Sequence, residues 1–136
     1  MKDQREDIQK TFGEYLLAFN TLKPAEVESF LHLPSMLMTS GQVVVMNKTD
    51  EVLGVFNVLM ESLKLKNFAE SKIIGSLRVT QLSDNQGLVV GAAKRFDKKN
   101  QEIEYFGFTY TLRKVEDKWK IIAGILHDPD DPETLV

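Results

Sequence analysis

Four strand-like segments joined by very short polar connections make up the second half of the chain, and no other feature constrains the fold as strongly. The segments are residues 70–82, 87–97, 102–115 and 118–127. Each connection is only two to four residues long. Connections this short can join only antiparallel neighbours, because a parallel return needs a crossover of a dozen or more residues. The pattern therefore predicts a four-stranded antiparallel meander.

Helical periodicity dominates the first half. A first amphipathic helix runs up to the Lys23–Pro24 step, where the residue before proline leaves the helical region. Pro24 then opens a short second helix. The strongest period begins at Thr49, with apolar residues at spacings of three and four through Leu63. Residues 34–46, which turn at Ser40–Gly41, are typical of a small hairpin.

These elements predict an α+β fold. Three N-terminal helices and a small hairpin pack on one face of a curved four-stranded antiparallel meander. A chain of 136 residues has the usual size of one domain, and no repeat or flexible linker divides it. We expect a single domain over residues 1–136, in which the acidic, proline-broken segment 128–136 forms a loose tail.

Composition excludes several classes of function. The formal net charge of −3 provides no basic surface for nucleic acid or an anionic membrane. No segment is long and apolar enough to span a bilayer, and the charged N-terminus does not resemble a signal peptide. The chain has no cysteine and only two histidines, so we expect no metal, no cofactor and a cytoplasmic location.

A family resemblance is carried by the last two strand segments. The run from Thr109 to Lys114, the turn at Glu116–Asp117 and the Trp119-Lys120-Ile121 run resemble the penultimate strand, turn and last strand of the nuclear transport factor 2-like superfamily. This superfamily has a cystatin-like fold and includes SnoaL-like and ketosteroid isomerase-like proteins. The resemblance implies a cone that encloses an apolar pocket, and dimers formed through the sheet.

Strand alternation predicts which side chains face the pocket. Phe106, Phe108 and Tyr110 share one face of their strand, and we assign this large apolar set to the helix-packed side. In the last strand the same reasoning places one alternating set on the pocket side, namely Trp119, Ile121, Ala123, Ile125 and His127. The opposite face is small and half-polar, which favours a homodimer through the outer sheet face.

His127 is the main candidate for acid–base chemistry, because it ends the predicted pocket row and an imidazole can act as general acid or base near neutral pH. Tyr110 and Tyr15 are candidates for stabilising an oxyanion. His32 either faces His127 across the cavity mouth or interacts with the carbonyls at the end of the short helix. The resemblance implies a polar residue, often histidine, six positions after Trp119, where this chain has Ile125. Purely structural roles also stay open for these residues. His127 could be a histidine at the rim of the cavity, and Tyr15 and Tyr110 could belong only to the core.

Other residues are candidates for binding a ligand. The predicted apolar lining consists of Tyr15, Phe19, Phe30, His32, Met36, Met38, Phe56, Met60, Phe106, Phe108, Trp119 and Ile125. Arg78 and Arg95 stand inside strand segments. Each either binds a ligand carboxylate, extends from the outer sheet face, or pairs with Glu102 or Glu104 on the next strand.

The sequence leads to three functional hypotheses. The first is a domain that binds a small hydrophobic ligand in the cone. The second is a cofactor-free SnoaL-like isomerase, cyclase or dehydratase, with His127 as base and a tyrosine as hydrogen-bond donor. The third is a protein-interaction module with a closed core. Whether the chain is an enzyme stays open at this point, since one fold can host all three functions.

Overall fold

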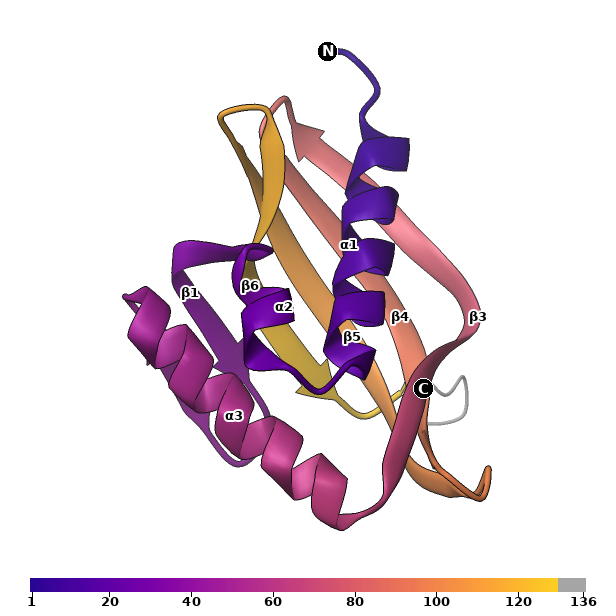
Figure 1. Cartoon of the computed structure of the whole chain (residues 1–136). Helices are drawn as coiled ribbons and strands as arrows, with labels where there is room; N and C mark the ends of the chain where they lie inside the picture. Colours follow the sequence, from indigo (N-terminus) through magenta and orange to yellow (C-terminus); the bar gives the residue numbers. More distant parts are fainter. Residues whose placement is uncertain (130–136) are drawn as a thin grey trace.

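Three helices cover one face of a six-stranded sheet in the computed structural model, which describes residues 1–129 (Figure 1). The helices are α1 (Arg5–Asn20), α2 (Pro24–Glu28) and α3 (Thr49–Leu65). The strands are β1 (Leu31–Met38), β2 (Val43–Met46), β3 (Phe68–Ser83), β4 (Gln86–Asp97), β5 (Glu102–Val115) and β6 (Lys118–His127). From residue 130 on, the predicted loose tail lies outside the described residues.

The helices begin and end close to where local chemistry predicted. Pro24 occupies the start of α2, where its missing N–H would have had no partner in any case. Helix α3 starts at Thr49 and buries Val52, Phe56, Met60 and Leu63 along one stripe. Asn67 follows α3 in the left-handed region, with φ 59°. The amphipathic stripes of α1 and α3 therefore fix which faces meet the sheet.

The predicted α+β class is confirmed, but the prediction of a four-stranded meander is wrong in its extent. The sheet has six strands in the order β2-β1-β6-β5-β4-β3, and β1 pairs with β6 in parallel. The hairpin predicted at 34–46 thus joins the main sheet instead of packing on it separately. An isolated two-stranded hairpin is marginally stable, and β6 without β1 would expose an unpaired edge.

A β-bulge in β6 changes which side chains face the helices. Leu112 pairs with Ile121 and Thr111 pairs with Ala123, so Ile122 is an extra residue on β6. One extra residue reverses the alternation for the remainder of the strand. Trp119 and Ile121 stay on the helix-covered side, whereas from Ala123 onward the predicted faces are exchanged, so the prediction that Ala123 faces the pocket is wrong.

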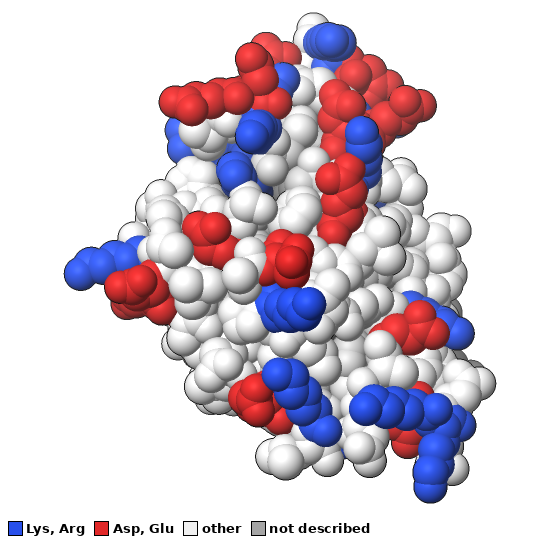
Figure 2. Space-filling model, viewed as in Figure 1, with Lys and Arg blue, Asp and Glu red and all other residues white. Residues whose placement is uncertain are grey.

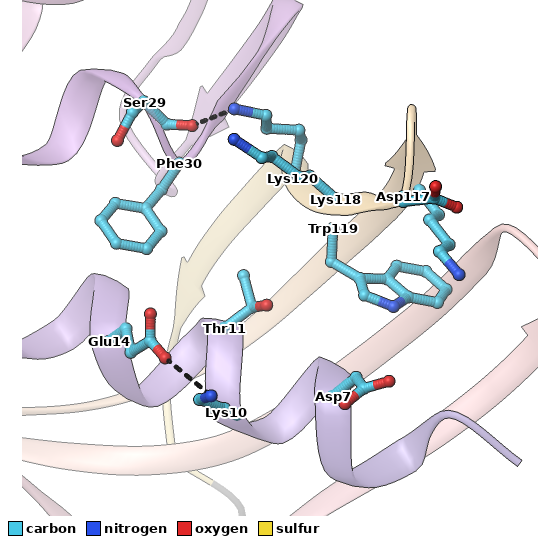
Figure 3. A pocket seen from close by; sticks show the side chains of 11 residues that line it. Asp7, Lys10, Thr11, Glu14, Ser29, Phe30, Asp117, Lys118, Trp119 and Lys120 are labelled. Carbon is cyan, nitrogen blue, oxygen red and sulfur yellow. Dashed lines mark hydrogen bonds and ion pairs between the residues drawn. The ribbon is translucent and has the colours of Figure 1, made fainter.

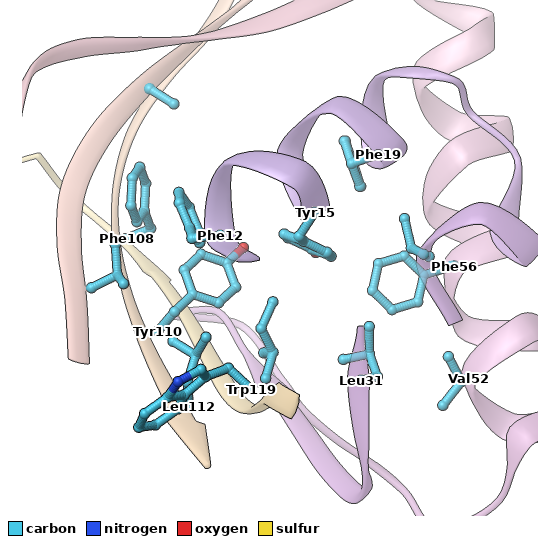
Figure 4. Close-up of a cluster of buried hydrophobic side chains, with 14 of the residues drawn as sticks. Phe12, Tyr15, Phe19, Leu31, Val52, Phe56, Phe108, Tyr110, Leu112 and Trp119 are labelled. Atoms are coloured by element: carbon cyan, nitrogen blue, oxygen red, sulfur yellow. The ribbon is translucent and has the colours of Figure 1, made fainter. Parts of the chain in front are cut away.

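The core lies between α1, α3 and the inner face of the sheet (Figure 4). Phe12 of α1 stacks on Phe108 of β5, with ring centroids 5.1 Å apart. The Tyr110 ring reaches from β5 toward the same helix, 5.0 Å from Phe12 and 5.8 Å from Tyr15. These aromatic contacts attach α1 to the centre of the sheet and shape the inner end of the cavity described below.

The helix-bearing surface carries charges of both signs, interspersed with uncharged residues (Figure 2). No helix within residues 1–129 is long and apolar enough to cross a bilayer.

Candidate functional site

A cavity of about 430 Å³ opens between α1, α3, the β1–β2 hairpin and the inner face of the sheet. Its lining is Tyr15, Phe19, Leu37, Met38, Thr39, Gln42, Val44, Val55, Phe56, Val58, Leu59, Ser62, Arg95, Tyr110, Gly124 and Leu126. Small-molecule sites commonly measure about 300–1,000 Å³ and are mostly apolar with a few polar groups. The size and the lining of this cavity both fall within that description.

Exposed lining residues define the mouth of the cavity. Thr39 and Gln42 from the β1–β2 turn are exposed, as are Val58 and Ser62 from α3. Tyr15 and Arg95, in contrast, are buried at the other end. The cavity therefore runs from a rim between α3 and the hairpin to a polar group of side chains at the sheet.

Two buried tyrosines form part of this polar inner end. Their rings lie 5.8 Å apart, and both hydroxyls belong to side chains that line the cavity. Burial raises the pKa of both phenols, and nearby Arg95 opposes that rise at each. Both hydroxyls are therefore protonated at neutral pH and act as donors in a largely apolar site.

Arg95 is the charged member of the inner end. It points inward from β4 and is 6% exposed, and its guanidinium lies 5.6 Å from the Phe19 ring centroid and 4.6 Å from that of Phe106. Its Nη1 donates to Glu104 Oε2 at 2.7 Å, so the predicted cross-strand pairing is confirmed. The alternative placement on the outer sheet face is wrong, because Arg95 shares the inner face with Val89 and Ala93. Arg78, on β3 opposite Val90, is absent from the described lining of the cavity.

The prediction that His127 faces the pocket is wrong. The bulge at Ile122 turns it to the outer face of the sheet, where its Nε2 lies 2.9 Å from Thr109 Oγ1. Its Nδ1 donates to the Asp128 carbonyl at 2.7 Å. These contacts hold the imidazole on the side of the sheet away from the cavity. Ile125 lies on the outer face for the same reason, and Gly124 and Leu126 take the positions predicted for Ile125 and His127.

Neither placement predicted for His32 is correct. The residue belongs to β1, not to the end of α2. Its Nδ1 donates to the Pro34 carbonyl at 2.8 Å, and its Nε2 accepts from Arg113 Nη1 at 3.0 Å. It lines a surface hollow beside Lys118 and Lys120, well separated along the sheet from the lining described above.

The other predicted ligand-binding residues divide among several places. Tyr15, Phe19, Met38, Phe56 and Tyr110 line the cavity. Met60 is fully buried on α3, and Phe106 and Phe108 line a small hollow of about 30 Å³ beneath α1. Met36 pairs with Ala123 on the outer face, so its prediction as a pocket residue is wrong.

Phe30 and Trp119 line a different depression, a groove of about 460 Å³ between α1 and the β5–β6 turn (Figure 3). Its other walls are mostly charged, with Lys10 and Glu14 on α1 facing Lys118 and Lys120 on β6. Within the groove Lys10 pairs with Glu14 and Lys120 donates to the Ser29 carbonyl. Because most of its walls are charged, the groove is a weaker candidate for an apolar ligand than the cavity.

Sequence reasoning missed the contribution of the hairpin and of Gly124. Leu37 and Val44 line the cavity because β1 and β2 extend the sheet. A Cβ added to Gly124 would lie 2.7 Å from the Tyr110 ring, so the absence of a side chain there makes room for Tyr110. In the sequence, only the glycine at position 124, in the strand after the one that carries Tyr110, could have indicated this close approach.

A helix-covered curved sheet with a cavity between the layers defines the class of protein as an α+β cone. The family described as "NTF2-like protein (DUF6841)" matches residues 5–129, and the chain belongs to this family. Comparison with curated proteins finds none that matches.

Solved structures share the fold at low sequence identity. An NTF2-like protein of unknown function from Shewanella oneidensis is 22% identical, with a TM-score of 0.70 over 90% of this chain and 98% of that chain. An NTF2-like protein with a cystatin-like fold from Novosphingobium aromaticivorans is 11% identical, with a TM-score of 0.75 over 96% and 85%. A ketosteroid isomerase-like protein from Erwinia carotovora atroseptica is 18% identical, with a TM-score of 0.67 over 97% and 100%. These similarities establish the fold and leave the activity to the site.

Proposed function

We propose that the chain is a binding domain for a small, largely apolar molecule, which occupies the cavity between α1, α3 and the hairpin. The observation that supports this proposal most directly is a mostly apolar cavity of about 430 Å³ with an exposed mouth and a polar inner end. Apolar walls provide the binding free energy, at about 25 cal/mol per Å² removed from water. The tyrosines and Arg95 fix the orientation of the ligand.

Proton-transfer catalysis is the alternative, and the ketosteroid isomerase-like neighbour is the reason to weigh it. The Tyr15–Tyr110 pair supplies donors for a developing oxyanion. Such an enzyme also needs a general base within reach of the substrate. Among the described lining residues, none is Asp, Glu or His. This lining favours binding over acid–base catalysis.

A protein-interaction module with a closed core is the third hypothesis. The cavity argues against a closed core. We therefore favour ligand binding over a protein-interaction module. The absence of cysteine remains the basis for proposing a cytoplasmic location.

A cavity-filling substitution tests the proposal. The probe is N-phenyl-1-naphthylamine, a neutral flat dye that fluoresces in apolar sites. We expect it to bind the wild-type chain at one site. Leu59→Trp fills the cavity from α3 and should weaken dye binding at least tenfold, whereas Leu65→Trp, exposed on the same helix and outside the lining, should leave it unchanged. Fluorescence titration measures both.

His127→Gln serves as a second control in the same titration. His127 lies on the opposite face of the sheet, so the variant should bind the dye as the wild type does. Equal dye affinity in wild type and Leu59→Trp would place the dye elsewhere and overturn the assignment of the cavity.

The outer sheet face supports a proposed homodimer. Val90, Thr109 and Ile125 lie in one row across β4, β5 and β6, and Leu88, Thr111 and Ala123 form the next row. Such a half-apolar face is suited to packing against a second copy.

Sedimentation velocity checks the dimer. We expect the wild type to sediment as a dimer at micromolar concentration and Ile125→Glu as a monomer, because the substitution buries an unpaired charge at the interface. Leu17→Glu, on the exposed side of α1, should remain dimeric. A dimeric Ile125→Glu variant would contradict this interface.

A further inference from the structure

Arg95 gives the cavity a definite electrostatic character. Sixteen residues line the cavity, and Arg95 is the one charged residue among them. Its partner Glu104 is absent from that lining. The Glu104 side chain is 41% exposed and lines a neighbouring hollow, which shares Met38, Thr39 and Leu126 with the cavity. Water screens the Glu104 carboxylate, while the guanidinium is held in a site of low dielectric. The described lining therefore presents to a ligand a guanidinium that is paired with Glu104 through Nη1, and no carboxylate.

The guanidinium also has hydrogen-bonding capacity that the chain does not use. Arginine carries five N–H donors. Nη1 donates to Glu104, whereas the buried Nε has no hydrogen-bond partner within residues 1–129. A buried donor without an acceptor is unfavourable, and a ligand that brings an acceptor removes that cost. The rings of Phe19 and Phe106 hold the guanidinium in place, so little additional ordering is needed when a ligand binds.

A second donor lies beside Arg95. Tyr110 lines the cavity, and because burial raises the pKa of its phenol, the hydroxyl is protonated and can donate to an acceptor on a ligand. Tyr15, Tyr110 and Arg95 all line both the cavity and the small hollow beneath α1, so the three groups occupy the same inner end. The remaining walls, from α3 and the β1–β2 hairpin, are mostly apolar and continue to the mouth.

We propose that the cavity selects ligands that carry a carboxylate on an apolar body, with the carboxylate bound by Arg95 and the Tyr110 hydroxyl and the apolar part directed toward α3 and the hairpin. This inference rests on the proposed function, since it names the chemical class of the ligand for the same cavity. Charge-assisted hydrogen bonds from arginine to a carboxylate are among the strongest in proteins and provide the selectivity. Amines are disfavoured by the same guanidinium.

A matched pair of probes tests the inference. Decanoate and 1-decanol share one alkyl chain and differ in the head group, and each is used to displace N-phenyl-1-naphthylamine from the wild-type chain at pH 7.5. We expect decanoate to bind about 10–100-fold more tightly than 1-decanol. Arg95→Met should remove that preference. Lys94→Met is the matched control, since Lys94 is the adjacent residue on the opposite face and pairs with Glu102 at 2.9 Å. It should keep the preference.

The outcomes separate this inference from the proposed function. Binding of the neutral dye, with equal affinity for decanoate and 1-decanol, would overturn the carboxylate assignment and leave the binding function intact. Failure of the dye itself to bind the cavity would overturn both. If Arg95→Met does not fold, Glu104→Gln takes its place. Glu104→Gln removes the carboxylate that competes for Arg95 Nη1. Decanoate should then bind several-fold more tightly than it does to the wild type, while the affinity for 1-decanol stays the same. An unchanged affinity for decanoate would contradict the inference.

Discussion

Replacing Phe12 with alanine should lower the free energy of unfolding by about 3–5 kcal/mol, the usual cost of removing a buried phenylalanine. The Phe12 side chain is 2% exposed and packs against the rings of Phe108, Tyr110 and Tyr15. Its loss leaves a cavity exactly where α1 is attached to β5, and the stacked rings around it can close that space only in part. Urea denaturation followed by circular dichroism measures the change.

Leu17→Ala provides the control for this experiment. Leu17 is on the same helix but is 70% exposed, so its substitution should change stability by no more than about 0.5 kcal/mol. A loss below about 1.5 kcal/mol for Phe12→Ala would mean that α1 repacks freely on the sheet. In that case the packing of α1 on β5 would not hold Tyr15 and Tyr110 in fixed positions at the inner end of the cavity.

Local patterns were sufficient to predict most of the secondary structure. The apolar spacing from Thr49 through Leu63 predicted nearly the whole of α3. The short polar connections predicted the antiparallel order of β3 to β6. Both signals come from interactions between residues close in sequence, which periodicity and turn chemistry express directly.

The position of the hairpin could not be predicted in this way. Strand β1 pairs with β6, about 90 residues later in the chain, and nothing in the residues of either strand specifies that partner. The pairing follows from the need to cover the edge of β6 once the meander has formed. For that reason the walls contributed by Leu37 and Val44 were absent from the predicted lining.

The candidate site was predicted in part, and one inserted residue explains the largest error. Tyr15, Phe19 and Tyr110 were assigned to the cavity from helix and strand periodicity, and they do line it. His127 was assigned by alternation along β6, which the bulge at Ile122 reverses. A β-bulge has no reliable signature in a single sequence, yet it moves every later side chain to the other face.

Raising the pH above about 10 should destabilise the protein steeply, because of the two buried tyrosines. Burial raises the pKa of Tyr15 and Tyr110 in the folded state, whereas in the unfolded chain both titrate near 10. Above that pH the unfolded state binds fewer protons than the folded state, so stability falls as pH rises. The contribution of the pair is fully present below about pH 9. Each tyrosine adds up to about 1.4 kcal/mol per pH unit to the slope.

Urea midpoints measured at intervals from pH 8 to pH 11 check this prediction against a matched set of variants. The double variant Tyr15→Phe/Tyr110→Phe has no phenols to ionise at these positions, so it should lose less stability between pH 10 and 11 than the wild type. Tyr105→Phe, at an exposed position on the outer sheet face, should follow the wild-type curve. Parallel curves for the wild type and the double variant would show that lysines and other groups, and not the buried pair, control the alkaline transition. The inner end of the cavity would then be more hydrated than the burial of these phenols implies, and its donors would be correspondingly weaker anchors for a ligand.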